Sequence, residues 1–74
     1  MNERLDLRSI PCPQNISKIV IKLEMMDSEE ILEVLLDEGE PLENVCQAIV
    51  EEGHLLIKKE KQEGNTCLLW IKKI

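Results

Sequence analysis

Residues 30–36 restrict the possible folds most, because aliphatic side chains fall on both sides of this stretch. These side chains are Ile31, Leu32, Val34, Leu35 and Leu36. In an extended strand, successive side chains point to opposite faces, so this stretch is apolar on both. Such a pattern is typical of the centre of a sheet, and the Asp37-Glu38-Gly39 turn signal ends it. We therefore predict a central strand.

Two stretches with helical spacing of apolar residues flank this strand. The first predicts a helix over about 13–25. A strand is the alternative there, because the Ile-Val-Ile run is β-branched and because Ile19, Ile21 and Leu23 are spaced two residues apart, as on one face of a strand. The length of the whole stretch and the proline at its start favour the helix. The second predicts a helix over about 41–52, with Pro41 at the first helical position. Gly53 follows the helix and is expected to end it in a left-handed backbone conformation.

Three further stretches indicate strands. Residues 4–8 alternate, with Leu5 and Leu7 on one face, and residues 54–61 and 66–73 form an antiparallel hairpin through a short glycine-containing connection. The element order is β-α-β-α-β-β. We predict one domain, residues 1–74, of the α/β (α+β) class: a two-layer sandwich with a four-stranded mixed sheet and both helices on one face.

The charge balance limits the partners of the chain. Fifteen acidic and nine basic residues give a net charge of −6, which repels nucleic-acid phosphates and anionic lipids. The apolar runs are shorter than the roughly 20 residues of a membrane helix. We therefore expect a cytoplasmic protein with no direct nucleic-acid or membrane partner. With 74 residues and one aromatic residue, a large enclosed pocket is not expected.

The three cysteines are predicted to be free thiols, because their number is odd and their spacing is wide. Cys46 lies on the apolar stripe of the second helix and Cys67 on the core face of the last strand, so both are expected to pack in the core. No Cys-x-x-Cys pair is present and His54 stands alone, as a turn residue before a strand. We expect no metal site and no cofactor.

Cys12 stands between Pro11 and Pro13 at the start of the first predicted helix. Pro13 biases the preceding residue toward the extended backbone of a helix N-cap, so we predict Cys12 at that position. Its sulfur would then lie near the backbone N–H groups of Gln14 and Asn15, at the positive end of the helix dipole. Such a position lowers a thiol pKa from about 8.5 into a range of about 3.5–7.5. The alternative is a small residue in a proline-rich turn.

The segments "LDLRSIPCPQN", "EEILEVLLDEGEP" and "EEGH", followed by the hairpin, resemble the TusA family of sulfur carriers along nearly the whole chain. Leu5-Asp6 and Cys12-Pro13 match the family motif in place and order. The resemblance implies a sulfurtransferase-type carrier without a cofactor. Its motif cysteine, here Cys12, takes sulfane sulfur as a persulfide from a cysteine desulfurase or another donor protein and passes it to an acceptor protein of a sulfur relay.

Two residues depart from the family pattern. Asn15 stands where a second proline is usual, and Ser9 stands where a glycine is usual. Asn15 is expected to restore a backbone N–H at the third helical position and to offer a carboxamide to a thiolate or persulfide. Ser9 restricts the backbone dihedral angles of the loop more than a glycine would. The alternative function is a non-catalytic regulatory or protein-interaction domain that retains the fold.

Six residues are expected to support the site around Cys12. Arg8 adds positive potential if the loop turns back over the thiol, and Pro11 stiffens the approach. The six residues are Asp6, Arg8, Pro11, Pro13, Gln14 and Asn15.

Overall fold

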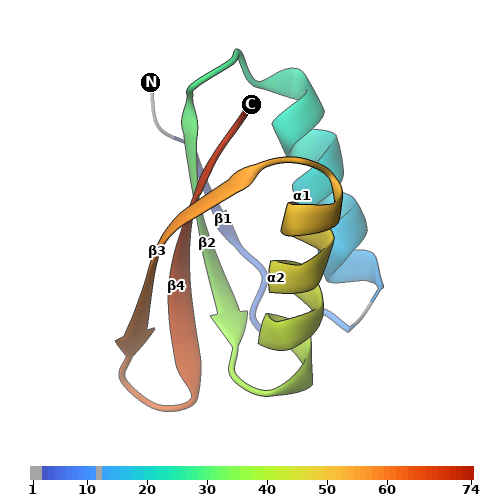
Figure 1. Ribbon diagram of the computed structural model, residues 1–74. Coiled ribbons are helices and arrows are strands. Elements are labelled where there is room, and N and C mark those ends of the chain that lie inside the picture. Colours follow the sequence, from blue (N-terminus) through green and yellow to red (C-terminus); the bar gives the residue numbers. More distant parts are fainter. Residues whose placement is uncertain (1–2, 12) are drawn as a thin grey trace.

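The computed structural model describes residues 3–11 and 13–74, and these form a sheet with two helices packed on one of its faces (Figure 1). The elements are β1 (Glu3–Asp6), α1 (Gln14–Met25), β2 (Ile31–Asp37), α2 (Glu40–Glu51), β3 (Leu55–Gln62) and β4 (Thr66–Lys72). The strand order in the sheet is β1-β2-β4-β3. The prediction of a two-layer sandwich with the order β-α-β-α-β-β is confirmed.

The sheet is mixed, as predicted. β1 runs parallel to β2, whereas β2 with β4 and β3 with β4 are antiparallel. The parallel pair follows from the crossover through α1, and the β3–β4 pair is a hairpin. β2 lies between β1 and β4, so the prediction of a central strand from its two apolar faces is confirmed.

The residues of α1 are helical despite their β-branched run. Ile19 and Leu23 are buried, whereas Ile21 between them is 58% exposed. A strand would place these three side chains on one face, but the helix turns Ile21 away from the sheet. The strand alternative for this segment is therefore wrong, because burial of the helical stripe outweighs local β propensity.

Some predicted element boundaries need correction. β1 ends at Asp6 rather than at residue 8, because Ser9 has a φ of +65° inside the turn that follows. α2 begins at Glu40 behind Gly39, whose φ is +98°, so Pro41 occupies the second helical position rather than the first. Gly53 has a φ of +84°, as its predicted place after the helix requires.

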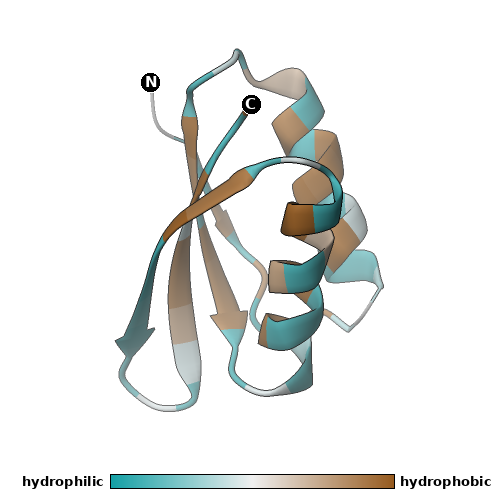
Figure 2. Cartoon of the chain, in the orientation of Figure 1, coloured by the Kyte–Doolittle hydropathy of each residue, from teal (hydrophilic) through white to brown (hydrophobic). Residues whose placement is uncertain are grey.

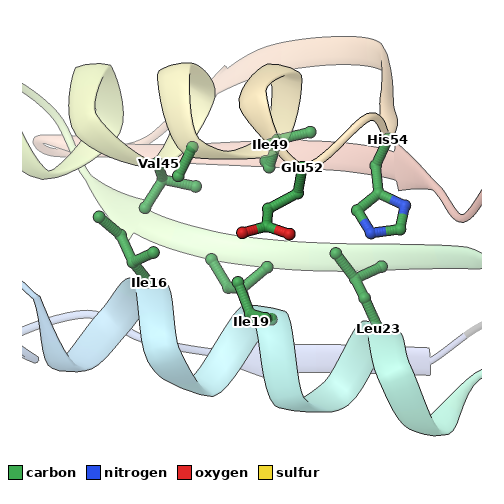
Figure 3. Close-up of a pocket in the computed structure, with 9 residues that line it drawn as sticks. Ile16, Ile19, Leu23, Val45, Ile49, Glu52 and His54 are labelled. Atoms are coloured by element: carbon green, nitrogen blue, oxygen red, sulfur yellow. The ribbon is translucent and has the colours of Figure 1, made fainter.

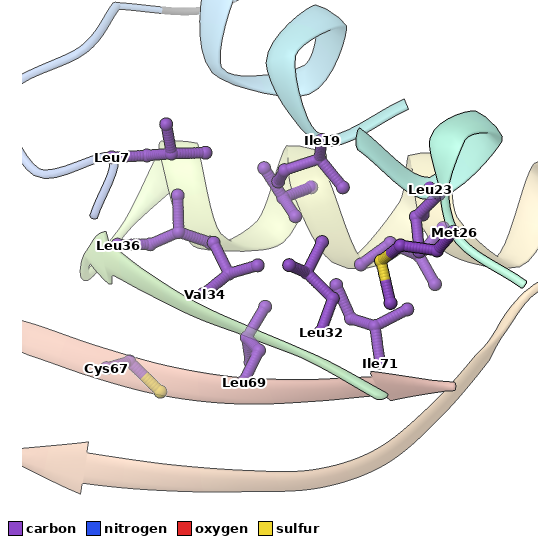
Figure 4. Close-up of a cluster of buried hydrophobic side chains, with 12 residues drawn as sticks. Leu7, Ile19, Leu23, Met26, Leu32, Val34, Leu36, Cys67, Leu69 and Ile71 are labelled. Atoms are coloured by element: carbon purple, nitrogen blue, oxygen red, sulfur yellow. The ribbon is translucent and has the colours of Figure 1, made fainter. Parts of the chain in front are cut away.

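The core is a single aliphatic layer between the helices and the sheet (Figure 4). Helix α1 contributes Ile19 and Leu23, which lie over the inner residues of the central strands. The inner residues of β2 and β4 are Leu32, Val34, Leu36, Cys67, Leu69 and Ile71, and all are buried. Figure 2 shows hydrophobic residues along β2 and β4. Within the described residues, no helix is long and apolar enough to cross a membrane.

Among the described residues, no helix covers the outer face of the sheet (Figure 1). Lys58 Nζ lies 4.8 Å from the centre of the Trp70 ring and 3.4 Å from a carboxylate oxygen of Glu60. On β1 and β2, Arg4 and Glu33 form an ion pair at 3.8 Å. Trp70 therefore lies on the outer face of the sheet, where these residues of opposite charge are paired.

Candidate functional site

The predicted site lies where the chain enters α1, and Cys12 itself lies outside the described residues. Pro11 and Pro13, which flank it in the sequence, are both exposed. The N-cap of α1 is Pro13, so the prediction of Cys12 at that position is wrong. The Pro13 carbonyl accepts the Ser17 N–H at 3.0 Å and so makes the first bond of the helix. Pro13 has no N–H, and the N-cap position does not require one.

Asn15 differs most from its predicted role. Its N–H donates to the Pro11 carbonyl at 3.1 Å, so this group is not free at the helix end. Its side chain is fully buried, and Oδ1 accepts the Ile16 N–H at 2.7 Å. Because the helix begins at Gln14, Asn15 is the second helical residue rather than the third. Its Nδ2 is buried and has no hydrogen-bond partner among the residues that the structure describes.

Asp6 and Arg8 form an exposed pair in the turn after β1. Arg8 Nε donates to Asp6 Oδ1 at 2.8 Å, and a second guanidinium nitrogen contacts Oδ2. The side-chain and backbone hydrogen bonds from Arg8 lower the pKa of Asp6 to about 2. The Arg8 charge is therefore largely balanced by Asp6, which weakens the positive potential expected from it.

The turn from Leu7 to Ile10 is held by a residue that the sequence did not single out. The Ser9 N–H donates to Asp37 Oδ2 at 2.7 Å, across 28 residues of sequence. Asp37 is the last residue of β2, and β1 lies parallel beside it. The parallel pairing brings the ends of both strands together, so a carboxylate directly after a predicted central strand was the available signal.

The two described cysteines, Cys46 and Cys67, are free thiols that are partly or fully buried. Cys67 is buried on the inner face of β4, and Cys46 is half-buried on α2 against the core. Desolvation by burial raises the thiol pKa of both. Both predicted core positions are confirmed, and neither thiol favours the ionised form that nucleophilic chemistry requires.

A small apolar cavity lies between α1 and α2 (Figure 3). It is lined by side chains such as Ile16 and Val45, with Glu52 and His54 at one end. Its volume of about 10 Å³ corresponds to roughly one water molecule, which is too little for a substrate. His54 lies between α2 and β3, as expected, and its Nδ1 accepts the Ile74 N–H at 3.3 Å. The described residues contain no group of three or more potential metal ligands.

Two comparisons with known proteins match nearly the whole chain. The family model described as "Sulfurtransferase TusA" matches residues 3–73. The chain belongs to the TusA family. A relative from Archaeoglobus fulgidus, named "Putative sulfur carrier protein", is 36% identical over 72 residues, which cover 97% of this chain and 82% of the relative. The TusA family match spans both departures from the usual motif, Ser9 and Asn15.

Proposed function

We propose that the protein is a sulfur carrier that holds sulfane sulfur as a persulfide on Cys12. Membership of the TusA family over residues 3–73, with the Cys12-Pro13 motif in place, is the observation that carries this proposal. The described surroundings agree with it, since the first turn of α1 contains no acidic residue to oppose an anionic sulfur. The other two cysteines lie in positions that favour the neutral thiol.

The chemistry needs two thiol exchange steps. The Cys12 thiolate attacks the outer sulfur of a donor persulfide, a new S–S bond forms, and the donor cysteine leaves as a thiolate. An acceptor thiolate then attacks the outer sulfur on Cys12 and releases the Cys12 thiolate. The sulfur atom is transferred without net oxidation or reduction, so neither step requires a metal or an organic cofactor.

The partners in this proposal are a donor protein, such as a cysteine desulfurase, and an acceptor protein of a sulfur relay. The net charge of −6 favours contact with basic protein surfaces over direct contact with nucleic acid. A thiol that must stay reduced between transfers suits the cytoplasm.

The supporting residues of the proposed site act mainly on the backbone around position 12. Pro11 supplies the carbonyl that accepts the Asn15 N–H, and Pro13 is the N-cap of α1. Gln14 is exposed in the first helical turn, where it leaves the helix dipole uncompensated. Asp6 and Arg8 brace the end of β1 through their paired side chains.

Mass spectrometry of the intact protein tests the function directly. After incubation with a cysteine desulfurase and free cysteine, or with inorganic polysulfide as a chemical donor, we expect a mass gain of one sulfur atom. Cys12→Ser should abolish the adduct, whereas Cys46→Ala and Cys67→Ala should retain it. An adduct that survives Cys12→Ser would contradict the proposal. No adduct from any donor would favour a non-catalytic interaction domain instead.

A further inference from the structure

The turn that precedes Cys12 is fastened to the end of β2. The Leu7 N–H donates to the Leu35 carbonyl at 2.9 Å, which continues the β1–β2 pairing by one residue. The Ile10 N–H then donates to the Leu7 carbonyl at 3.2 Å and closes the turn. Leu7 is buried and Ile10 packs against the core. Both ends of the turn are thus fixed to the body of the protein.

The middle of this turn has an unfavourable backbone conformation. Ser9 has a φ of +65°, a left-handed conformation that is unfavourable for a residue with a Cβ atom and readily adopted by glycine. A conformation of this kind persists only when surrounding contacts hold it. Asp37 provides such a contact, because its carboxylate accepts the Ser9 N–H at 2.7 Å. Hydrogen bonds to a charged group are about twice as strong as neutral ones.

The same turn sets the direction in which the chain approaches α1. Pro11 follows Ile10 directly, and its carbonyl accepts the Asn15 N–H at 3.1 Å. Pro11 and Pro13, the sequence neighbours of residue 12, therefore belong to a stretch that runs from a turn tied to β2 to the first turn of the helix. A change at Ser9 alters the path of the chain three residues before the sulfur-carrying residue.

We propose that Asp37 is a positioning residue for sulfur transfer, whose carboxylate holds the Leu7–Ile10 turn so that Cys12 is presented to the donor sulfur. This inference rests on the proposed role of Cys12. The charged side chain that acts on this region from the turn itself is Arg8, which pairs with Asp6 and is attracted by Asp37. On the neighbouring strand, Thr66 stands opposite Asp37.

Variants at both ends of the hydrogen bond provide the test. Asp37→Ala removes the acceptor, Asp37→Asn keeps an acceptor oxygen without the charge, and Ser9→Gly makes the left-handed turn favourable without help. Glu38→Ala is the matched control, because Glu38 is the neighbouring carboxylate and pairs with Lys61 at 3.9 Å instead. The readouts are the rate of sulfur loading on Cys12 from inorganic polysulfide and the pH profile of Cys12 alkylation, both followed by peptide mass spectrometry.

We expect Asp37→Ala to slow loading about tenfold, as for the loss of a charged hydrogen bond that positions a reacting group. Asp37→Asn should stay within about twofold of the wild type, because the acceptor remains. Adding Ser9→Gly to Asp37→Ala should restore most of the rate, since glycine adopts the turn unaided. Glu38→Ala should load at the wild-type rate. The alkylation midpoint should shift in Asp37→Ala and not in Asp37→Asn.

Two results would overturn the inference. One is an Asp37→Ala variant that loads and titrates like the wild type. The other is an equal change in Asp37→Ala and Asp37→Asn that Ser9→Gly does not reduce, since this would show an effect of charge rather than of position. If Asp37→Ala does not fold, the double variant and Asp37→Asn still decide between these outcomes. A wild type that takes no sulfur defeats the proposed function, while the alkylation profiles still test Asp37.

Discussion

The two helices begin in different ways although both start beside a proline. α2 starts behind Gly39, and its first turn contains Glu40 and Glu43, whose negative charges complement the helix dipole. α1 starts behind Pro13 and has no acidic residue in its first turn, while neither helix start has a side-chain cap. It also holds the buried Asn15, whose Nδ2 has no partner in the described part of the chain.

This difference separates stability from function. The acidic residues in the first turn of α2 stabilise that helix end. The start of α1 lacks this contribution and keeps its positive potential available, which suits a proposed anionic sulfur at the adjacent position. α1 can accept a weak start because its buried stripe, rather than its cap, holds it to the sheet.

The largest effect should come from that stripe. Ile19→Ala removes a side chain that is 2% exposed and should reduce the free energy of unfolding by about 3 kcal/mol, because it leaves a cavity in the core. Urea denaturation followed by circular dichroism measures this. Ile21→Ala, at a position that is 58% exposed, is the control and should change stability by less than about 0.5 kcal/mol. Similar losses from both variants would show that α1 is not held by its stripe.

A smaller effect is expected from Asn15 at the start of α1. Asn15→Ala removes the acceptor of the Ile16 N–H and should lower the free energy of unfolding by about 1 kcal/mol. The loss stays at this low end because the substitution also removes the buried Nδ2 that lacks a described partner. Ser17→Ala, an exposed position in the same turn, serves as the control in the same denaturation assay. A stabilised Asn15→Ala variant would mean that the unpaired amide outweighs the hydrogen bond.

The smallest effects test the charge difference between the two helix starts. Gln14→Glu should raise the free energy of unfolding by about 0.3–1 kcal/mol, because a negative charge enters the first turn of α1. It should also raise the pKa of the Cys12 thiol, measured by pH-dependent alkylation, because like charges disfavour the thiolate.

Glu40→Gln is the reciprocal change in α2. It should lower stability by a similar amount, about 0.3–1 kcal/mol, and leave Cys12 alkylation unchanged. If Gln14→Glu left both stability and the alkylation profile unchanged, the absence of acidic residues from the α1 start would have no functional meaning.

The ranges of the elements with a strong apolar periodicity were the most predictable. β2, the hairpin and both helices lie within one or two residues of their predicted ranges, because their apolar side chains must face one layer whatever the local detail. The start of α1 was less predictable. Cys12 was placed at the N-cap from the preference of residues before proline, yet Pro13 occupies that position. Asn15 was expected to face the site, but the helix begins one residue later and turns its side chain into the core.

The sequence alone determined the element order, the central strand, the family and the candidate thiol, since each depends on residues that are close in the chain or on a continuous motif. Only the tertiary structure decided that Asp37 reaches Ser9. The Asp37 contact joins residues 28 positions apart, and parallel pairing of β1 and β2 is what brings them together. A local pattern marks Asp37 as a carboxylate at the end of a strand but does not identify its partner, because the contact exists only once the sheet has formed.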